Sequence, residues 1–208
     1  LALHRRLLGN DHPMIGDCLN NLANLLWEKG KMDESKSLYK EALALDRKLL
    51  GGDHPYIAMD LNNLALVLRD SGDLAGALPL VDEAIDVITR AEGADSPTAA
   101  LYLASRAALY LRMGRNDDAE KVIQEALRIQ RKTLPEGQWR ILQNRSIHGE
   151  ILAALGRNEE AEHVLIESYE GLRDQLGEKN GYTRRARKAV QAFYESTGRP
   201  ERAVAYAS

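Results

Sequence analysis

The chain has 208 residues, 44% of them hydrophobic and 28% charged, a balance that excludes a disordered or collagen-like polypeptide. A net charge of -3 argues against nucleic acid as a partner, because phosphate binding needs clustered Lys and Arg. The longest apolar run covers residues 99–104, far short of the roughly 20 residues that span a bilayer, so we expect no membrane partner.

Cys18 is the single cysteine, which excludes an internal disulfide framework and fits a reducing compartment. We therefore expect a cytoplasmic location. The sequence begins at Leu1 without a Met or a signal-peptide pattern, and this predicts a fragment or a processed product.

Taken along the chain, glycines recur at an interval of 42 residues, at positions 30, 72, 114, 156 and 198. An apolar stripe with helical spacing precedes each glycine and a second one follows it. Each period therefore predicts an A helix, a turn and a B helix. The expected helices cover residues 13–29, 32–50, 55–71, 74–92, 97–113, 116–133, 139–155, 158–176, 181–197 and 200–207.

The repeat predicts an all-α fold, a right-handed solenoid of antiparallel helix pairs that forms a single array over residues 1–208. Residues 1–9 are expected to be half of a preceding B helix. The expected repeats cover residues 10–51, 52–93, 94–135 and 136–177, with a partial repeat over residues 178–208.

Small residues recur where the paired helices must approach closely. The two columns contain Ala23, Ala65, Ala107 and Gly149, and Ser35, Ala77, Ala119, Ala161 and Ala203. Left-handed caps are expected after the B helices at Gly9, Gly51, Gly93 and Gly177, with Pro135 in the fourth instance. Helix starts are indicated by Asp11, Asp53 and Asp95, each two residues before a proline. Pro79 falls inside an expected helix and removes one of its hydrogen bonds.

Several segments resemble the 42-residue tetratricopeptide repeats of the kinesin light chain type. They are Leu-Gly-Gly-Asp-His-Pro at residues 50–55, Leu-Asn-Asn-Leu-Ala at 19–23 and 61–65, and Lys-Glu-Ala-Leu at 40–43. Residues 134–140 and 198–203 resemble the final repeats of arrays attached to bacterial serine/threonine protein kinases. The family resemblance implies a helical scaffold whose matching asparagines hold the main chain of a bound peptide.

Motifs that carry enzymatic chemistry are missing from the sequence: it has no phosphate-binding glycine loop, no His-Glu-x-x-His and no Gly-x-Ser-x-Gly. His12 and His54 occupy the same column of neighbouring repeats, roughly 10 Å or more apart, too far to share a metal ion. We expect no catalytic residue, no metal and no cofactor.

The A helices of such a solenoid line a concave groove, which is the candidate peptide-binding site. The expected groove residues are Asn20, Asn21, Asn24, Asn62, Asn63, Leu66, Arg69, Ser105 and Arg112. An amide both donates and accepts, so a ladder of asparagines can pair with the backbone of an extended ligand. The alternative is that one Asn of each pair only fixes the packing of the repeats. A clamp for a terminal carboxylate is disfavoured, because Asn20, Leu101 and Ser105 stand where it needs cations.

A polar patch is expected in the C-terminal half at Arg106, Arg145, His148 and Glu150. Arg106, Arg145 and His148, together with Arg187, interrupt columns that are apolar in the first two repeats, so their charges must be paired or reach solvent. Two interpretations remain open: a polar network between the last repeats, or an anion-binding patch.

The predicted function is non-catalytic binding of a protein or extended peptide, within a larger bacterial signalling protein. One alternative is self-assembly through an exposed end of the array that carries Leu3 and Leu7. The other is docking on an attached serine/threonine kinase domain.

Overall fold

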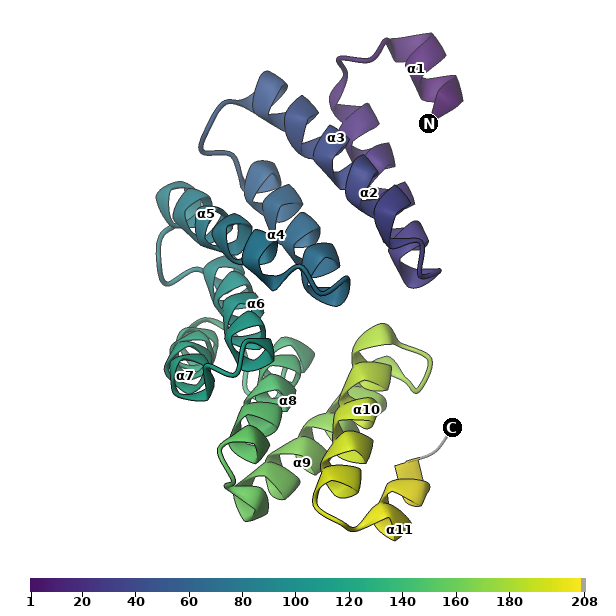
Figure 1. Cartoon of the computed structure of the whole chain (residues 1–208). Helices are drawn as coiled ribbons and strands as arrows, with labels where there is room; N and C mark the ends of the chain where they lie inside the picture. Colours follow the sequence, from purple (N-terminus) through teal and green to yellow (C-terminus); the bar gives the residue numbers. More distant parts are fainter. Residues whose placement is uncertain (207–208) are drawn as a thin grey trace. The chain divides into compact units, whose positions relative to one another are not determined.

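The computed structural model describes residues 1–206, and all regular secondary structure in this range is helical (Figure 1). The helices are α1 (Ala2–Leu8), α2 (Pro13–Glu28), α3 (Met32–Leu50), α4 (Pro55–Asp70), α5 (Leu74–Glu92), α6 (Pro97–Arg112), α7 (Asn116–Thr133), α8 (Trp139–Ala154), α9 (Asn158–Leu176), α10 (Gly181–Ser196), α11 (Pro200–Ala203) and the short 3-10 helix η1 (Val204–Tyr206).

The expected helices are confirmed, with two differences. Each A helix ends one residue earlier than predicted, because the residue before the turn glycine leaves the helix as its cap. The helix expected over residues 200–207 is instead the short α11 followed by η1, and residue 207 lies outside the described residues.

The chain folds into two compact units, the first ending at Leu109 and the second beginning at Tyr110. In the first unit, α2 packs on α3, α3 on α4, and α4 on α5. In the second unit, α8 packs on α7 and α9, while α10 packs on α9, α8 and α11. These antiparallel helix pairs confirm the predicted all-α fold (Figure 1). A single continuous array over residues 1–208 stays a prediction.

The two columns of small residues are confirmed as sites of close helix approach. Ala23 and Ser35 are fully buried, and the Ser35 hydroxyl donates a hydrogen bond of 2.8 Å to the Ala23 carbonyl. A Cβ atom on Gly149 would lie 2.7 Å from Cγ of Leu165. In these two pairs, α2–α3 and α8–α9, the helices touch through backbone and the smallest side chains, which leaves no room for larger residues.

Each turn after an A helix closes in the same way, as Gly72 illustrates. Its φ of 89° is readily available only to glycine. This conformation lets the next N–H, that of Asp73, donate to the Leu68 carbonyl at 2.9 Å, the long-range bond of a Schellman motif. The equivalent bond forms after the other four turn glycines.

The caps expected after the B helices differ from the prediction. Gly51 has φ 80° and ψ 178°, so it is extended in the region reserved for glycine and is not left-handed helical. Gly9, Gly93 and Gly177 are similar. The predicted left-handed caps were therefore wrong in the ψ angle. The chain is extended at these glycines because it runs on to the next A helix and does not fold back over the end of the B helix. After α7, the cap is Leu134, and Gly137 takes the positive φ.

The helix starts are confirmed, but the capping groups are His12 for α2, His54 for α4 and Ser96 for α6, and not the aspartates. His54 Nδ1 accepts a hydrogen bond from the Tyr56 N–H at 3.2 Å, and His12 caps α2 in the same way. Asp53 instead forms an ion pair with Arg90 of α5. Pro79 is exposed, and α5 continues through it without a break.

We predict that His54→Ala lowers the free energy of unfolding by about 1 kcal/mol, because the first turn of α4 loses a capping acceptor. His54→Asn should retain the stability, since Asn supplies an oxygen at the cap. Urea denaturation followed by circular dichroism measures both. Asp53→Ala is the matched control and should cost less, because it removes only an exposed ion pair. A larger loss for Asp53→Ala than for His54→Ala would contradict this assignment.

Candidate functional site

The A helices of the first unit carry amides that are exposed or half-buried. Asn21 on α2 is exposed and Asn63 on α4 is half-buried, and neither has a hydrogen-bond partner among residues 1–206. Asn24 is also exposed, but its Oδ1 accepts a hydrogen bond of 2.5 Å from the Tyr39 hydroxyl. Asn21 and Asn63 are therefore the side chains best placed to meet a ligand's backbone.

Asn20 and Asn62, the first residue of each Asn pair, lie in the interior with 6% and 5% exposure. The Asn20 amide donates to Asp60 Oδ1 at 2.6 Å, a contact between α2 and α4. Neighbouring residues on a helix point about 100° apart, so the two amides of a pair have different surroundings: the first is buried and the second is more accessible. The geometry therefore favours a packing role for Asn20 and Asn62.

The other predicted groove residues have mixed surroundings. Leu66 and Arg69 are half-buried on α4, and Arg69 forms an ion pair with its neighbour Asp70. Ser105 is buried, with its hydroxyl 3.4 Å from the Leu101 carbonyl on its own helix. Arg112 is exposed at the end of α6.

Sequence reasoning missed a buried pair of carboxyl groups between α3 and α4. Asp60 is fully buried and Asp46 has 4% exposure. Asp46 lies against the α2 backbone, where a Cβ atom on Gly16 would come 2.8 Å from its Oδ1. Asp60 Oδ2 has no N–H or O–H donor in the described part of the chain. A proton on one carboxyl group, shared in a hydrogen bond with the other, removes both the repulsion and the missing partner.

The pKa values of this pair follow from its burial. Desolvation raises the pKa of Asp60 to about 7; the hydrogen bond from Asn20 opposes this rise, and the negative charge of Asp46 adds to it. Burial and the charge of Asp17 also raise the pKa of Asp46, against lowering effects of its hydrogen bond with Asp60 and of His54. The pair therefore holds a proton near neutral pH that an ordinary aspartate would lose.

The repeat places a neutral version of this pair in the second unit. Gln130 and Asn144 stand 84 residues, or two periods, after Asp46 and Asp60, and both are buried. Gln130 donates a hydrogen bond of 3.3 Å to the Arg140 carbonyl. One sequence signal could have revealed the carboxyl pair: Asp60 falls on the apolar stripe of its helix, beside Leu61 and Leu64.

Two residues of the expected polar patch, Arg106 and Arg145, have partners on neighbouring helices. Arg106 lies 3.5 Å from Asp82 of α5, and Arg145 forms an ion pair with Glu167 of α9. Burial lowers the pKa of His148, whose Nε2 lacks a hydrogen-bond partner within residues 1–206. The polar network and the anion-binding patch both stay predictions.

A hollow of about 220 Å³ lies between α8 and α10, and we refer to it as the α8–α10 hollow. Its lining consists of Glu150, Ala153, Leu165, Ala189, Ala192, Phe193 and Ser196. Five of these seven residues lie at the groove positions expected from the repeat, on the A helices α8 and α10. The second unit thus has an apolar recess where the first unit presents amides.

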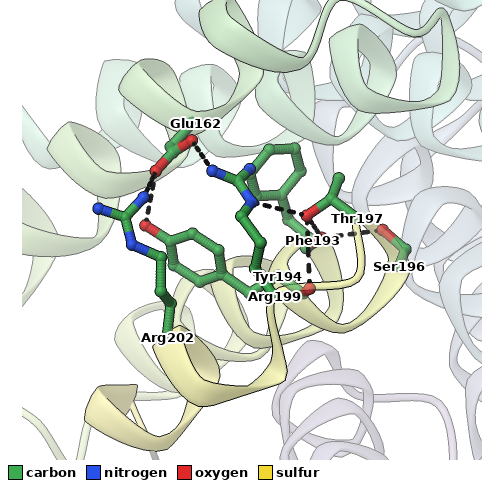
Figure 2. Close-up of polar contacts among 7 residues, drawn as sticks. All are labelled: Glu162, Phe193, Tyr194, Ser196, Thr197, Arg199 and Arg202. Carbon is green, nitrogen blue, oxygen red and sulfur yellow. Dashed lines mark hydrogen bonds and ion pairs between the residues drawn. The ribbon is translucent and has the colours of Figure 1, made fainter.

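A cluster of charged and aromatic residues holds the far end of α10 in place (Figure 2). Glu162 of α9 accepts hydrogen bonds from Arg199 at 2.6 Å, Arg202 at 2.5 Å and the Tyr194 hydroxyl at 3.0 Å. The Arg199 guanidinium also lies 5.3 Å from the ring centre of Phe193. Burial raises the pKa of Glu162, but these hydrogen bonds and positive charges outweigh it and lower the pKa overall. The cluster thereby fixes one wall of the hollow.

Two classes of site find no support in the described part of the chain. No helix there is both long and apolar enough to cross a membrane. Residues 1–206 also contain no group of three or more His, Cys, Asp or Glu side chains able to hold a metal ion.

Comparison with known proteins identifies the family. The tetratricopeptide repeat model matches residues 1–48, 17–80 and 57–132, which together cover more than half of the chain. The chain therefore belongs to the tetratricopeptide repeat family. No curated protein sequence matches it.

Solved structures with the same fold include the nearly identical TPR-like repeats of a putative kinesin light chain from Podosopora anserina. That match has a TM-score of 0.67 and 19% identity and covers 94% of this chain and 93% of the other. BtubC (BKLC) from P. vanneervenii has a TM-score of 0.72 and 19% identity, with 99% and 83% covered. The kinesin light chain-like resemblance is thus confirmed at the level of fold.

A Rap protein complexed with competence and sporulation factor gives a TM-score of 0.76 at 16% identity. The match covers 90% of this chain but only 50% of the Rap protein. The resemblance of the C-terminal part to kinase-associated arrays stays a prediction.

We predict that Asp60→Asn removes a pH dependence of stability. The folded state binds the Asp60 proton more tightly than the unfolded chain, whose aspartate pKa is near 3.8. The stabilisation is therefore complete below about pH 4 and is lost as the pH rises through about 7. The Asn variant should have the same free energy of unfolding as the wild type at pH 4.5. At pH 8 its free energy of unfolding should be higher than that of the wild type by on the order of 2–4 kcal/mol. Urea unfolding at both pH values measures this.

Asn144→Asp is the matched control, because it places a carboxyl group at the equivalent position beside Gln130. The stability of this variant should fall as the pH rises from 4.5 to 8. The buried carboxyl group must then either become charged in the interior or keep its proton, and keeping the proton costs more free energy as the pH rises. An Asp60→Asn variant that keeps the full pH dependence of the wild type would rule out the proton-sharing pair.

Proposed function

We propose that this chain is a non-catalytic binding module that holds an extended peptide on the A-helix faces of its repeats. The observation that carries the proposal is that exposed Asn21 and half-buried Asn63 stand at equivalent positions of successive A helices and have no hydrogen-bond partner among residues 1–206. Each can donate to a ligand carbonyl and accept from a ligand N–H, whatever the ligand's side chains.

The family and the solved structures support this class of function. Tetratricopeptide repeat proteins are generally non-catalytic scaffolds for other proteins. Two similar structures are Rap proteins crystallised with a competence and sporulation factor and with a Phr* peptide. The proposal therefore rests on a fold that holds peptides elsewhere, together with suitable side chains in this chain. The setting in a larger bacterial signalling protein and the docking on an attached kinase stay predictions.

The test is selection of random dodecapeptides displayed on phage against the wild-type chain, followed by affinity measurements with the selected peptides. Asn21→Ala/Asn63→Ala should weaken binding about tenfold or more, since each lost hydrogen bond is worth about 1 kcal/mol. Ser37→Ala/Lys40→Ala changes two exposed residues of the B helix α3 and should leave affinity unchanged. Circular dichroism checks that both variants keep their helicity.

Two outcomes of this experiment would count against the proposal. Peptides that bind both variants with wild-type affinity would move the binding surface away from the amides of the first unit. A selection that yields no binding peptide would contradict the proposed function.

Self-association is a second candidate because α1 carries an exposed apolar face. Leu3 and Leu7 are 56% and 69% exposed on this helix. Apolar faces of this kind mark interaction sites. We expect Leu3→Lys/Leu7→Glu to lower the average mass at high protein concentration, as measured by sedimentation equilibrium. A wild-type protein that stays monomeric at all concentrations would exclude this candidate.

A further inference from the structure

The α8–α10 hollow has a filled counterpart in the first unit. Positions 126 residues apart, or three periods, are equivalent in the repeat. In place of Ala153 and Leu165, the first unit has Trp27 and Tyr39. Trp27 packs against the core of the first unit, and Tyr39 is fully buried within that core. The first unit therefore fills with its own aromatic side chains the region that the second unit leaves open.

The polar contacts of these aromatic residues identify matching positions in the second unit. The Trp27 indole N–H donates to Asp70 Oδ2 at 3.1 Å. Ser196, a lining residue of the hollow, stands 126 residues after Asp70. Its hydroxyl donates to the Phe193 carbonyl at 2.9 Å, which leaves its oxygen lone pairs available to accept. The hollow thus keeps a hydrogen-bond acceptor where the first unit bonds its indole.

Other replacements enlarge the space, and one reduces it. Asn63 and Leu66 of the first unit become Ala189 and Ala192 in the second, which removes side-chain volume from α10. Phe193 is larger than the equivalent Val67, but its ring lies beside Arg199 and Tyr194 in the Glu162 cluster (Figure 2). The Phe193 ring therefore lines the hollow and does not fill it.

The dimensions of the hollow suit one side chain. Its volume of about 220 Å³ is below the roughly 300–1,000 Å³ of small-molecule sites. Its lining is mostly apolar, which favours an apolar occupant. Ser196 at the polar side selects an occupant that can donate a hydrogen bond. Among natural side chains, tryptophan combines a large apolar ring with an N–H donor.

We infer that the α8–α10 hollow binds the side chain of a tryptophan in a peptide ligand, with the indole N–H donating to the Ser196 hydroxyl oxygen. This inference rests on the proposed function, since it names the residue of the bound peptide that the second unit recognises. The ligand's indole occupies in the second unit the space that Trp27 occupies in the first.

The first experiment titrates the ¹⁵N-labelled wild-type chain with pentapeptides of the form acetyl-Gly-Gly-X-Gly-Gly-amide, where X is Trp, 1-methyl-Trp, Leu or Ala. With Trp, we expect saturable shifts of the backbone amides of Ala153, Ala189 and Ala192. The 1-methyl-Trp peptide should bind about three- to tenfold more weakly, because its ring nitrogen has no hydrogen to donate. Amides that do not shift, or a Leu peptide that binds as tightly as the Trp peptide, would overturn the inference.

The second experiment fills the hollow from within. Ala153→Trp places an indole where the repeat has Trp27, and it should weaken binding of the Trp pentapeptide at least tenfold. Ala44→Trp adds the same residue at an exposed position of α3 and should leave the shifts unchanged. Binding that survives in folded Ala153→Trp would overturn the inference. The wild-type titration remains decisive if this variant does not fold.

The outcomes separate this inference from the proposed function. Phage-selected peptides that bind the chain but are unaffected by Ala153→Trp would leave the proposed function standing and refute the role of the hollow. A selection without any binding peptide, together with a Trp pentapeptide that shifts the amides of the hollow, would refute the extended-peptide site and keep the indole site.

Discussion

The contact between the two helices of each pair is the constraint from which the other features follow. Ala23 meets Ser35 with no exposed surface, and Gly149 leaves no space for a Cβ atom beside Leu165. Interiors packed this tightly transmit any change in side-chain size to the helix separation. Because the contact recurs every 42 residues, equivalent positions face equivalent surroundings, and differences between them can be interpreted chemically.

Two sets of equivalent positions show how a repeated backbone acquires different properties. The interior site between consecutive repeats holds two carboxyl groups at Asp46 and Asp60 but two amides at Gln130 and Asn144. The first pair must bind a proton to remain buried, whereas the second is neutral at every pH. Beside the A helices, Trp27 and Tyr39 fill the first unit, whereas Ala153, Ala189 and Ala192 line a recess in the second.

Helix geometry explains why only part of the predicted asparagine ladder is available to a ligand. Adjacent residues diverge by about 100°, so the inward position of Asn20 turns Asn21 toward solvent. The buried Asn20 stabilises the junction with α4 through Asp60. Binding and packing are thus divided between two neighbours of the same residue type, and the sequence pattern alone treats them alike.

The sequence by itself determined the helices, the turns and the family, because these depend on local periodicity. The apolar stripes and the glycines with positive φ act over one or two helix turns, and this local pattern recurs every 42 residues. Only the tertiary structure decided that Asp46 meets Asp60 across two helices and that His54, not Asp53, caps α4. It also decided where the α8–α10 hollow lies, since three helices must come together to enclose it. Such features depend on distances between separate elements, and helical periodicity carries no information about those distances.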